Sequence, residues 1–552
     1  MNTDNPIPAM TEKKELVANW ETLERIFIRP EDEASRTALV KYMEQILFGL
    51  HDFLRKHVGI TREASLEELS RRFTESRISR NPRKKLADVI KGIIEDIAPH
   101  AVNVTSPYFI GHMTSAIPFF MVHLQTIMSA LHQNPVKLET SKVVSILERQ
   151  VLAKIHRTIY NQDESFYEKH IQAPESTLGS FTDDGTLANL TALWAARNAF
   201  FRPRGRFRGV EEEGMACALK TYGYDRCVVL TSRLGHYSLR KAGGVLGIGS
   251  ANVIPVEVDR NSRMDTRRLR QMIREIHKDS QKSRVLAVVG IAGATETGTV
   301  DPLPEIAEIC AEHQIHFHAD AAWGGPTLLS EKYKSLLRGI EQADSVTIDG
   351  HKQFYMPMGC GMVYFKDPGA ADHIAYYAAY VIRPGSVDLG IRSIEGSRAA
   401  TSLILGSALE IMGAGGYALL IEHGIETAKE FAAEISSRPF FELVTAPQLN
   451  ILTYRLFPPE LRREWEKGDL QTRKKITLKV NQINILLQRL QREAGKSFVS
   501  RTTLRRKNRE DTVVLRSVIM NPMTDMHIIR EILDEQEEIY HSHIQTSGNC
   551  SE

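Results

Sequence analysis

The chain has 552 residues, with 70 basic and 68 acidic side chains and a formal net charge of +2. This length is too great for one small domain and predicts two or three lobes around a sizeable core. The balanced charge argues against nucleic acid or an anionic membrane surface as a partner.

The first hundred residues are expected to be helical, because apolar residues recur every three to four positions in residues 39–47 and 86–94. A more apolar region follows and ends in a helix over residues 145–159. Within this region, residues 116–128 are too short and too interrupted by proline and polar residues to cross a bilayer. We therefore expect them to form a buried core segment and expect no membrane partner.

Short β-branched runs alternate with helical segments between residues 181 and 365. Near-continuous apolar strands separated by helices predict a mostly parallel sheet that is covered on both faces. Functional side chains then gather at the carboxyl ends of the strands. The strands are expected at residues 227–230, 253–256, 285–290, 315–317 and 346–348.

A second, smaller α/β unit is expected after about residue 402. A long helix starts at residue 401, and another spans about residues 476–493. The strands of this unit are expected at residues 441–444, 450–454, 497–500 and 513–519.

The cysteines and the N-terminus bear on the cellular compartment. An odd, scattered set of cysteines predicts neither a disulfide framework nor a zinc site. The polar N-terminus lacks the basic-then-apolar pattern of a signal peptide. We therefore expect a cytoplasmic protein without a metal site. The cysteines are Cys217, Cys227, Cys310, Cys360 and Cys550.

Two strand ends carry a lysine and a carboxylate. Lys352 follows the run 345–348, and Asp320 follows the run 315–317. Pyridoxal phosphate (PLP) needs such a pair, because the lysine forms a Schiff base and the carboxylate pairs with the protonated pyridine nitrogen. Ala322 would then press against the ring, and His351 could reach the phosphate. Considered singly, Asp320 could cap a helix and Lys352 could be a surface lysine.

A small-residue turn at residues 179–184 precedes a helix expected over residues 187–198. Such a turn points free N–H groups and the positive end of the helix dipole at an anion. Gly185 and Thr186 would supply backbone donors to the phosphate, and Thr186 also its hydroxyl. The alternative is an ordinary helix cap made by Asp184 or Thr186.

Two further strand ends carry residues that could contact the pyridine ring of PLP. His236 follows one strand, where its imidazole could lie flat over the pyridine ring and touch the substrate carboxylate. Thr295 lies in a Gly-rich loop after the strand 285–290 and could bond the ring oxygen. Each has an ordinary structural alternative: a satisfied histidine at a strand–helix junction and a common βα loop. The succession of all these motifs at strand ends favours a PLP site.

This order of motifs resembles the group II PLP-dependent decarboxylases, which include glutamate and aromatic amino acid decarboxylases, over about residues 106–522. The most specific segments are His318-Ala319-Asp320-Ala321-Ala322-Trp323 and Asp349-Gly350-His351-Lys352. The resemblance implies an aspartate aminotransferase-type (fold type I) α/β fold. It also implies a homodimer with active sites at the interface. The implied parts are an N-terminal helical segment on the dimer partner (1–105), a large PLP-binding domain (106–400) and a small C-terminal domain (401–552).

The resemblance also implies residues that act on the substrate. The acid that returns a proton to the α-carbon is a tyrosine on a mobile loop, for which we choose Tyr380, with Tyr376 and Tyr377 as competitors. Arg516 resembles the arginine with which glutamate decarboxylases bind a substrate carboxylate. His112 aligns with a substrate loop. A solvent-facing arginine and an ordinary loop histidine are the alternatives.

Residues 134–141 and 388–398 resemble the bacterial PLP-dependent aspartate 1-decarboxylases, which make β-alanine for pantothenate synthesis. We therefore expect decarboxylation of an acidic amino acid, with aspartate ahead of glutamate. Glutamate decarboxylation to 4-aminobutyrate is the alternative, since the two substrates differ by one methylene. An aminotransferase or lyase on the same fold, and a catalytically silent binding protein, are the more distant alternatives.

Overall fold

The chain forms two compact units in the computed structural model. The first contains residues 1–106 and 492–497, and the second contains residues 107–491 and 498–552. The division of the second unit into domains at residue 400 stays a prediction. The structure describes residues 33–58, 66–278, 282–378, 386, 388–505 and 511–545.

The first unit is built from short helices with little core. The helices expected over residues 39–47 and 86–94 are confirmed. Phe48 is 79% exposed and Leu47 51% exposed, so the unit leaves large apolar side chains in solvent. The helices are α2 (Glu33–Gly49), α3 (His51–Leu54), α4 (Leu66–Arg72) and α5 (Leu86–Gly92).

The second unit contains a seven-stranded sheet with the order β1-β7-β6-β5-β4-β2-β3. Strands β2 to β6 are parallel to one another, whereas β7 runs antiparallel to both β6 and β1. The mostly parallel sheet is thus confirmed. The parallel strands are β2 (Arg226–Ser232), β3 (Val253–Val256), β4 (Ser283–Ile291), β5 (His316–Asp320) and β6 (Ser345–Asp349).

One expected turn is partly a strand. Residues 179–182, expected within a turn, form strand β1 (Gly179–Thr182), which pairs with β7 (Gly361–Phe365). All four residues of β1 are buried. The sequence Gly-Ser-Phe-Thr has weak strand propensity, so the pairing with β7 decides its conformation.

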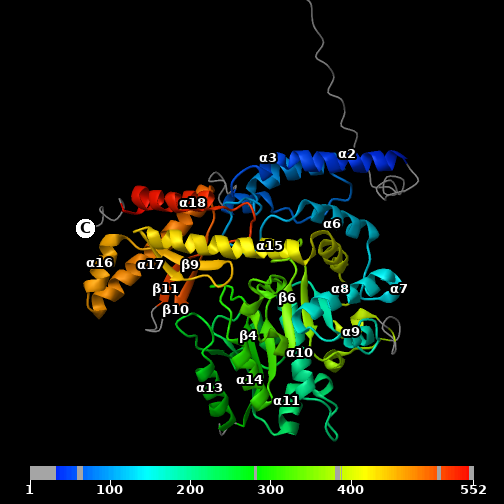
Figure 1. Ribbon diagram of the computed structural model, residues 1–552. Coiled ribbons are helices and arrows are strands. Elements are labelled where there is room, and N and C mark those ends of the chain that lie inside the picture. Colours follow the sequence, from blue (N-terminus) through cyan, green and yellow to red (C-terminus); the bar gives the residue numbers. More distant parts are fainter. Residues whose placement is uncertain are drawn as a thin grey trace, which may run out of the picture. The chain divides into compact units, whose positions relative to one another are not determined.

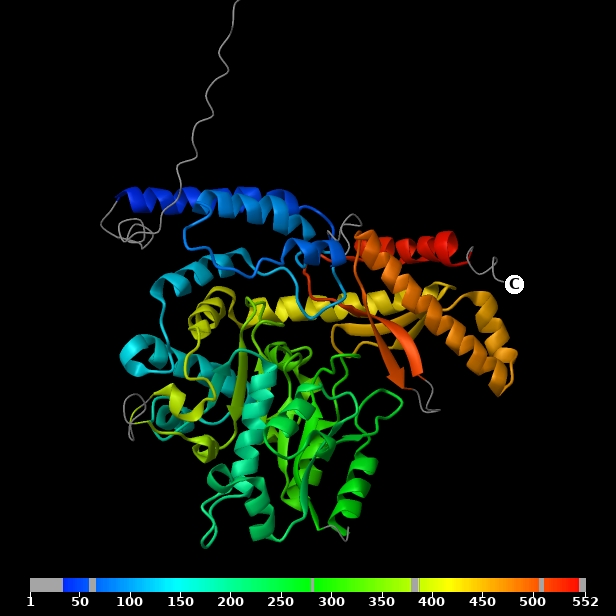
Figure 2. The same cartoon turned by 180° about the vertical axis from the view of Figure 1, so that it is seen from behind.

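Helices cover both faces of this sheet, and neighbouring residues of β4 show the division. Ala287 packs in a cluster with α10 (Gly185–Phe200) and α12 (Ser238–Val245). The next residue, Val288, packs in a cluster with α13 (Thr266–Lys278) and α14 (Leu303–His313). Figure 1 shows α13 and α14 beside the sheet, and Figure 2 shows α10 crossing its other face. Burial on both faces explains the near-continuous apolar strands.

A four-stranded antiparallel sheet, with the order β10-β11-β9-β8, forms the smaller α/β region. The strand expected at residues 497–500 is wrong, because β10 begins at Ser500, which pairs with Arg516. Phe498 instead forms an isolated bridge with Phe109. The strands are β8 (Phe441–Thr445), β9 (Ile451–Leu456), β10 (Ser500–Arg505) and β11 (Asp511–Val518), and the helices are α16 (Pro459–Lys467), α17 (Leu470–Ala494) and α18 (Met526–Ile539).

Helix α15 (Thr401–Ser437) joins the two regions, and it packs on β8 and β9 as well as on α8 (Val143–Tyr160). Among the described helices, α15 alone has the length and apolar composition of a membrane span, a property that the core helices of soluble proteins share. Its Leu405 and Ile421 lie in the main core. Gly413, with φ of 61°, breaks the helical geometry midway, which its missing side chain permits.

Helix α6 (Phe119–Leu131) corrects the expectation of a buried segment at residues 116–128. Only Met121 and Met128 of this helix are buried. Phe119 is 78% exposed, and Ile127 is half exposed. A single chain therefore leaves an apolar helix face uncovered.

His156, on α8, is fully buried between the Tyr167 hydroxyl (3.0 Å from Nδ1) and the Phe365 carbonyl oxygen (3.0 Å from Nε2). Burial lowers its pKa to about 4, because the charged imidazole is poorly solvated there. The folded protein therefore holds this histidine neutral at pH values where an unfolded chain protonates it.

We predict that His156 makes the protein acid-sensitive. Between about pH 6.5 and 4 the unfolded state binds one more proton than the folded state, so stability falls as the pH falls, by up to ~3 kcal/mol. The His156→Gln variant should show a shallower decline of the free energy of unfolding over this window in urea titrations. Equal slopes for variant and wild type would contradict the prediction.

Candidate active site

A cavity of about 720 Å³ lies at the carboxyl ends of the parallel strands. It brings together residues from six segments that are far apart in the sequence, as parallel strands do at one edge of a sheet. Nine of the residues singled out in the sequence line it: His112, Gly185, Thr186, His236, Thr295, Asp320, Ala322, His351 and Lys352.

Lys352 forms an ion pair at the end of β6. Its Nζ lies 2.9 Å from Oδ2 of Asp349, whose side chain is 3% exposed. His351 lies beside the pair, with Nε2 3.7 Å from the same oxygen and Nδ1 2.7 Å from the Cys360 carbonyl oxygen. Asp349 thus holds the Lys352 side chain by an ion pair, a role that the sequence pattern alone did not indicate.

The first turn of α10 lies against this pair. Asp184 caps the helix by accepting a hydrogen bond from the Leu187 amide at 2.9 Å, so its carboxylate is turned back onto the helix. A Cβ on Gly185 would lie 2.8 Å from Oδ2 of Asp349, so a larger residue would not fit there. The backbone amides of Gly185 and Thr186 remain at the cavity, where they can bind an anion.

Asp320, at the end of β5, is 6% exposed. Its Oδ2 accepts a hydrogen bond from Nδ2 of Asn189 at 2.9 Å, and its Oδ1 accepts one from the Ala322 amide at 3.2 Å. Within the described part of the chain, no cation pairs with it. A buried carboxylate without a counter-charge is unfavourable, and a protonated pyridine nitrogen would supply that charge.

His236 is the candidate for contact with a flat cofactor ring. His236 lies between β2 and α12, with Nδ1 2.9 Å from the Ser238 hydroxyl. Burial lowers its pKa, which favours the neutral imidazole. The structure therefore places a lysine, a carboxylate, an imidazole and a helix N-terminus around one cavity, and these residues could hold PLP.

Arg516, on β11, is 7% exposed, so the alternative of a solvent-facing arginine is wrong. Its Nε donates to the Thr295 carbonyl at 2.6 Å, and its Nη1 donates to the Gly111 carbonyl and the Ser500 hydroxyl, each at 3.1 Å. Burial lowers its pKa to about 10, an effect that nearby Glu296 partly offsets. Among the described residues it has no ion-pair partner and Nη2 has no acceptor.

His112 lies near Arg516 and Lys352. Its pKa is lowered first by burial and then by the positive charges of these two residues. Lys352 lines the cavity, whereas Arg516 is not among the lining residues and reaches the cavity only through its hydrogen bond to Thr295. An anionic group beside His112 would therefore lie near both positive charges.

The tyrosine proposed as the acid lies outside the described residues, since Tyr380 falls in the undescribed range 379–385. Its competitors do not line the cavity. The Tyr376 hydroxyl donates to Glu211 at 2.5 Å, and Tyr377 is 53% exposed. The identity of the acid therefore stays a prediction.

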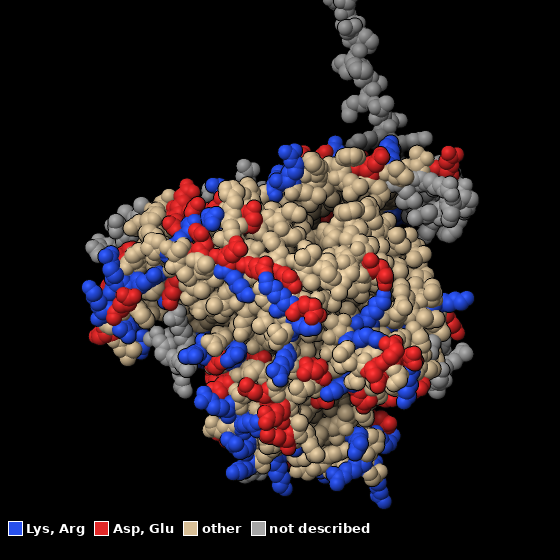
Figure 3. Space-filling model, in the orientation of Figure 1, with Lys and Arg blue, Asp and Glu red and all other residues tan. Residues whose placement is uncertain are grey.

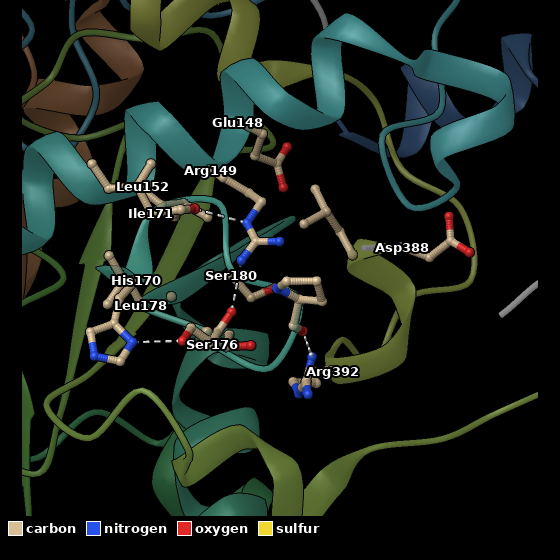
Figure 4. Close-up of a pocket in the computed structure, with 14 residues that line it drawn as sticks. Glu148, Arg149, Leu152, His170, Ile171, Ser176, Leu178, Ser180, Asp388 and Arg392 are labelled. Carbon is tan, nitrogen blue, oxygen red and sulfur yellow. Dashed lines mark hydrogen bonds between the residues drawn. The ribbon is translucent and has the colours of Figure 1, made fainter. Parts of the chain in front are cut away.

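A second cavity, of about 30 Å³, lies beside β1 and α8 (Figure 4). Arg149 points into it, but its guanidinium donates to the backbone carbonyls of Ile171, Ala173 and Ser176. Arg392 likewise donates to Asp372 and to a backbone carbonyl. These arginines hold loops in place, so we assign no chemistry to this cavity.

Comparison with known proteins shows the family to which the chain is similar. The family described as "Pyridoxal-dependent decarboxylase conserved domain" matches residues 69–457. An aspartate 1-decarboxylase of Aliivibrio fischeri is 42% identical over 532 residues, which cover 96% of each chain. The human acidic amino acid decarboxylase GADL1 is 27% identical over 401 residues, or 71% of each chain.

Solved structures of low identity share the fold. The crystal structure of mouse CSAD superposes with a TM-score of 0.77 at 22% identity, covering 91% of this chain and 99% of that one. The structure of Oryza sativa TDC with PLP and tryptamine also gives a TM-score of 0.77, at 17% identity, covering 93% of this chain and 100% of that one. The expected fold type I architecture is thereby confirmed.

The ion pair between Lys352 and Asp349 predicts energetic coupling in the cofactor-free protein. Either Lys352→Ala or Asp349→Asn should lower the free energy of unfolding, because each leaves a buried or partly buried partner without its counter-charge. The double variant should lose less than the sum of the single losses, by about 1 kcal/mol, since Lys352 is partly exposed. Urea titrations of the four proteins measure this coupling, and strict additivity would contradict it.

Proposed function

The chain belongs to the pyridoxal-dependent decarboxylase family, and we propose that it decarboxylates an acidic L-amino acid, aspartate ahead of glutamate. It is a PLP-dependent amino acid decarboxylase, and the proposed products from aspartate are β-alanine and carbon dioxide. Glutamate, giving 4-aminobutyrate, is the second candidate because one added methylene changes binding by only ~1–3 kcal/mol.

The observation that carries this proposal is the buried guanidinium of Arg516 without a carboxylate partner. Burying a charge without an ion-pair partner is costly, and nearby Glu296 offsets only part of that cost, so the site gains when a ligand brings a carboxylate. The planar guanidinium can bind that carboxylate through two parallel hydrogen bonds. The proposal is supported by its hydrogen bond to the carbonyl of Thr295, a residue that lines the cavity.

His112 supports a substrate with a second negative charge. Every amino acid substrate carries an α-carboxylate, but an acidic one carries another at its side-chain end. His112 lies close enough to Arg516 and Lys352 for their charges to lower its pKa, so a second carboxylate bound beside His112 would also lie near the Arg516 guanidinium. A bound substrate with a side-chain carboxylate would also favour protonation of His112, which would add a charged hydrogen bond.

The comparisons support the same substrate class. The relative at 42% identity, which matches nearly the whole chain, is an aspartate 1-decarboxylase. The human relative at 27% identity is an acidic amino acid decarboxylase. The relative at 42% identity carries this support, because relatives at 27–29% identity also include decarboxylases of L-2,4-diaminobutyrate and of aromatic amino acids.

The cofactor roles follow from the geometry of the cavity. Lys352 is proposed to hold the cofactor covalently, and Asp320 to pair with its pyridine nitrogen. The amides of Gly185 and Thr186, with His351, would bind the phosphate. PLP supplies a protonated ring that accepts the electron pair released when carbon dioxide leaves the α-carbon.

Residues around the ring are proposed to orient cofactor and substrate. His236 would lie over one face of the ring and meet the substrate carboxylate, while Ala322 would press on the other face. Thr295 would approach the ring oxygen. Tyr380 is proposed to return a proton to the α-carbon.

We also propose that the protein is a homodimer. The surface over α6 and the first half of α15 has few charged side chains, whereas α11 (Val210–Tyr222) and α13 carry dense mixed charge (Figures 1 and 3). A contiguous exposed apolar patch is typical of an interaction surface, and most oligomers are built from copies of one chain, so a second copy is the occupant that we propose. The exposed apolar residues are Phe119, Val122, Ile127 and Leu131 of α6 with Ile411 and Leu419 of α15.

We propose a reducing, cytoplasmic location because the described cysteines form no disulfide. The four described cysteines are free thiols, and three of them are buried. Burial raises the pKa of the Cys227 and Cys360 thiols to about 12, so these groups are unreactive.

The dimer proposal predicts that charge on the apolar patch separates the subunits. The double variant Phe119→Glu/Ile411→Glu should shift the sedimentation coefficient from dimer towards monomer, because two buried glutamates per subunit would lack counter-charges. Leu478→Glu is the matched control, since Leu478 is 64% exposed on α17, away from the patch. A monomeric wild type, or an unchanged dimer in the double variant, would contradict the proposal.

A panel of amino acids tests the substrate. Purified PLP-loaded enzyme should release carbon dioxide from aspartate faster than from glutamate, and from both far faster than from neutral or aromatic amino acids. Arg516→Lys should raise KM for aspartate about 10- to 100-fold, because a point charge replaces the bidentate guanidinium.

Two controls make this test specific. Arg501→Lys, on the exposed side of neighbouring β10, should leave KM unchanged. Lys352→Ala should abolish carbon dioxide release and the visible absorbance of bound PLP. Turnover of an aromatic or other neutral amino acid, with aspartate and glutamate both inert, would overturn the substrate proposal.

A further inference from the structure

A row of polar residues runs along one face of β5. His316, His318 and Asp320 alternate with apolar residues, so all three point to the face on which α10 packs. Asn189 of α10 lies opposite this row and is 1% exposed. A buried amide needs hydrogen-bond partners for both its oxygen and its nitrogen.

The side chain of Asn189 is fully used. Its Nδ2 donates to Oδ2 of Asp320 at 2.9 Å and to the hydroxyl of Ser238 at 3.1 Å. Its Oδ1 lies 2.9 Å from Nε2 of His318. An ionised carboxylate only accepts hydrogen bonds, so the amide nitrogen must face Asp320 and the oxygen must face His318.

This orientation determines the protons on the His318 branch. Since Oδ1 of Asn189 only accepts, Nε2 of His318 carries the proton. Nδ1 of His318 then accepts from the Ser345 hydroxyl at 2.8 Å, and that hydroxyl in turn accepts from Nε2 of His316 at 2.8 Å. Burial lowers the pKa of His318 to about 4, so this branch is neutral.

The same orientation determines the tautomer of His236. The Ser238 hydroxyl accepts a hydrogen bond from Asn189, so its own proton remains available for Nδ1 of His236, 2.9 Å away. The Ser238 amide lies 3.4 Å from the same nitrogen, which also marks Nδ1 as the acceptor. His236 thus carries its proton on Nε2, the remaining polar edge of a ring that lines the cavity.

We propose that Asn189 is a positioning residue that couples the Asp320 carboxylate to the His236 imidazole. One side chain holds Oδ2 of Asp320 in place and, through Ser238, keeps the Nε2–H of His236 as the donor in the cavity. The Asp320 carboxylate, which would pair with the pyridine nitrogen, and the His236 imidazole, which would lie over the ring, are thereby oriented together. This role does not depend on which amino acid is the substrate.

The proposal is tested with Asn189→Asp, which keeps the shape and the acceptor for His318 but removes both donors. PLP should dissociate about tenfold faster from the loaded enzyme, and kcat should fall about tenfold or more, with KM within about threefold of wild type. The pH at which the absorbance of bound PLP changes should shift, because a misplaced Asp320 stabilises the protonated ring nitrogen less well.

Thr191→Val is the matched control on the same helix. Thr191 is as deeply buried as Asn189, but its hydroxyl donates only to the Leu187 carbonyl within α10. This variant should keep the wild-type rate of PLP dissociation, kcat and pH profile. Equal behaviour of Asn189→Asp and Thr191→Val in all three measurements would overturn the proposal.

Ser238→Ala keeps the test decisive if Asn189→Asp does not fold. It removes only the branch to His236, so kcat should fall and its pH profile should shift, while PLP dissociates at nearly the wild-type rate. Wild-type kcat and pH profile in this variant would overturn the assigned tautomer. All assays use whichever amino acid the wild-type enzyme turns over, so a wrong substrate assignment cannot be mistaken for a failure here.

Discussion

The burial of the Asp320 carboxylate without a cationic partner is the constraint on which the site depends. Within the described residues its hydrogen bonds come only from the Asn189 amide and the Ala322 backbone, which are neutral donors. Neutral donors offset only part of the cost of removing a charge from water. The carboxylate is therefore poised for a positively charged ring nitrogen, and the polar residues around it are arranged to keep its two oxygens fixed.

The parallel sheet explains why the other groups gather around this carboxylate. Each parallel strand ends at the same edge, so residues separated by more than a hundred positions become neighbours without long loops. Arg516 arrives from the second sheet, which is tied to the first by buried amides. The Trp323 indole donates to Asn450, and the Asn450 amide donates to the Ile519 carbonyl at the end of β11. Contacts between the two sheets therefore fix where Arg516 lies relative to the strand ends.

Much of this arrangement was predictable because the chemistry needs particular residue types at strand ends. Lys352 and Asp320 each follow an apolar run that is too short for a helix and is therefore predicted to be a strand. Parallel strands end at one edge of a sheet, so the pattern placed both residues at that edge. The predictions that were wrong concern segments whose conformation or burial depends on contacts with distant residues. The run 179–182 is a strand because β7 pairs with it. Residues 116–128 have the apolar composition of a core segment, but the single chain leaves most of helix α6 uncovered.

The sequence by itself determined the cofactor class, the sheet type and the residues at the strand ends, because local patterning and residue chemistry set these properties. Only the tertiary structure decided which polar residues act together. Asn189, Ser238 and His318 gave no separate signal, since an isolated amide, hydroxyl or imidazole in a buried segment has many ordinary uses. Their role emerges from hydrogen bonds of about 3 Å between α10, β5 and α12, and such contacts are created by packing rather than by neighbouring positions in the chain.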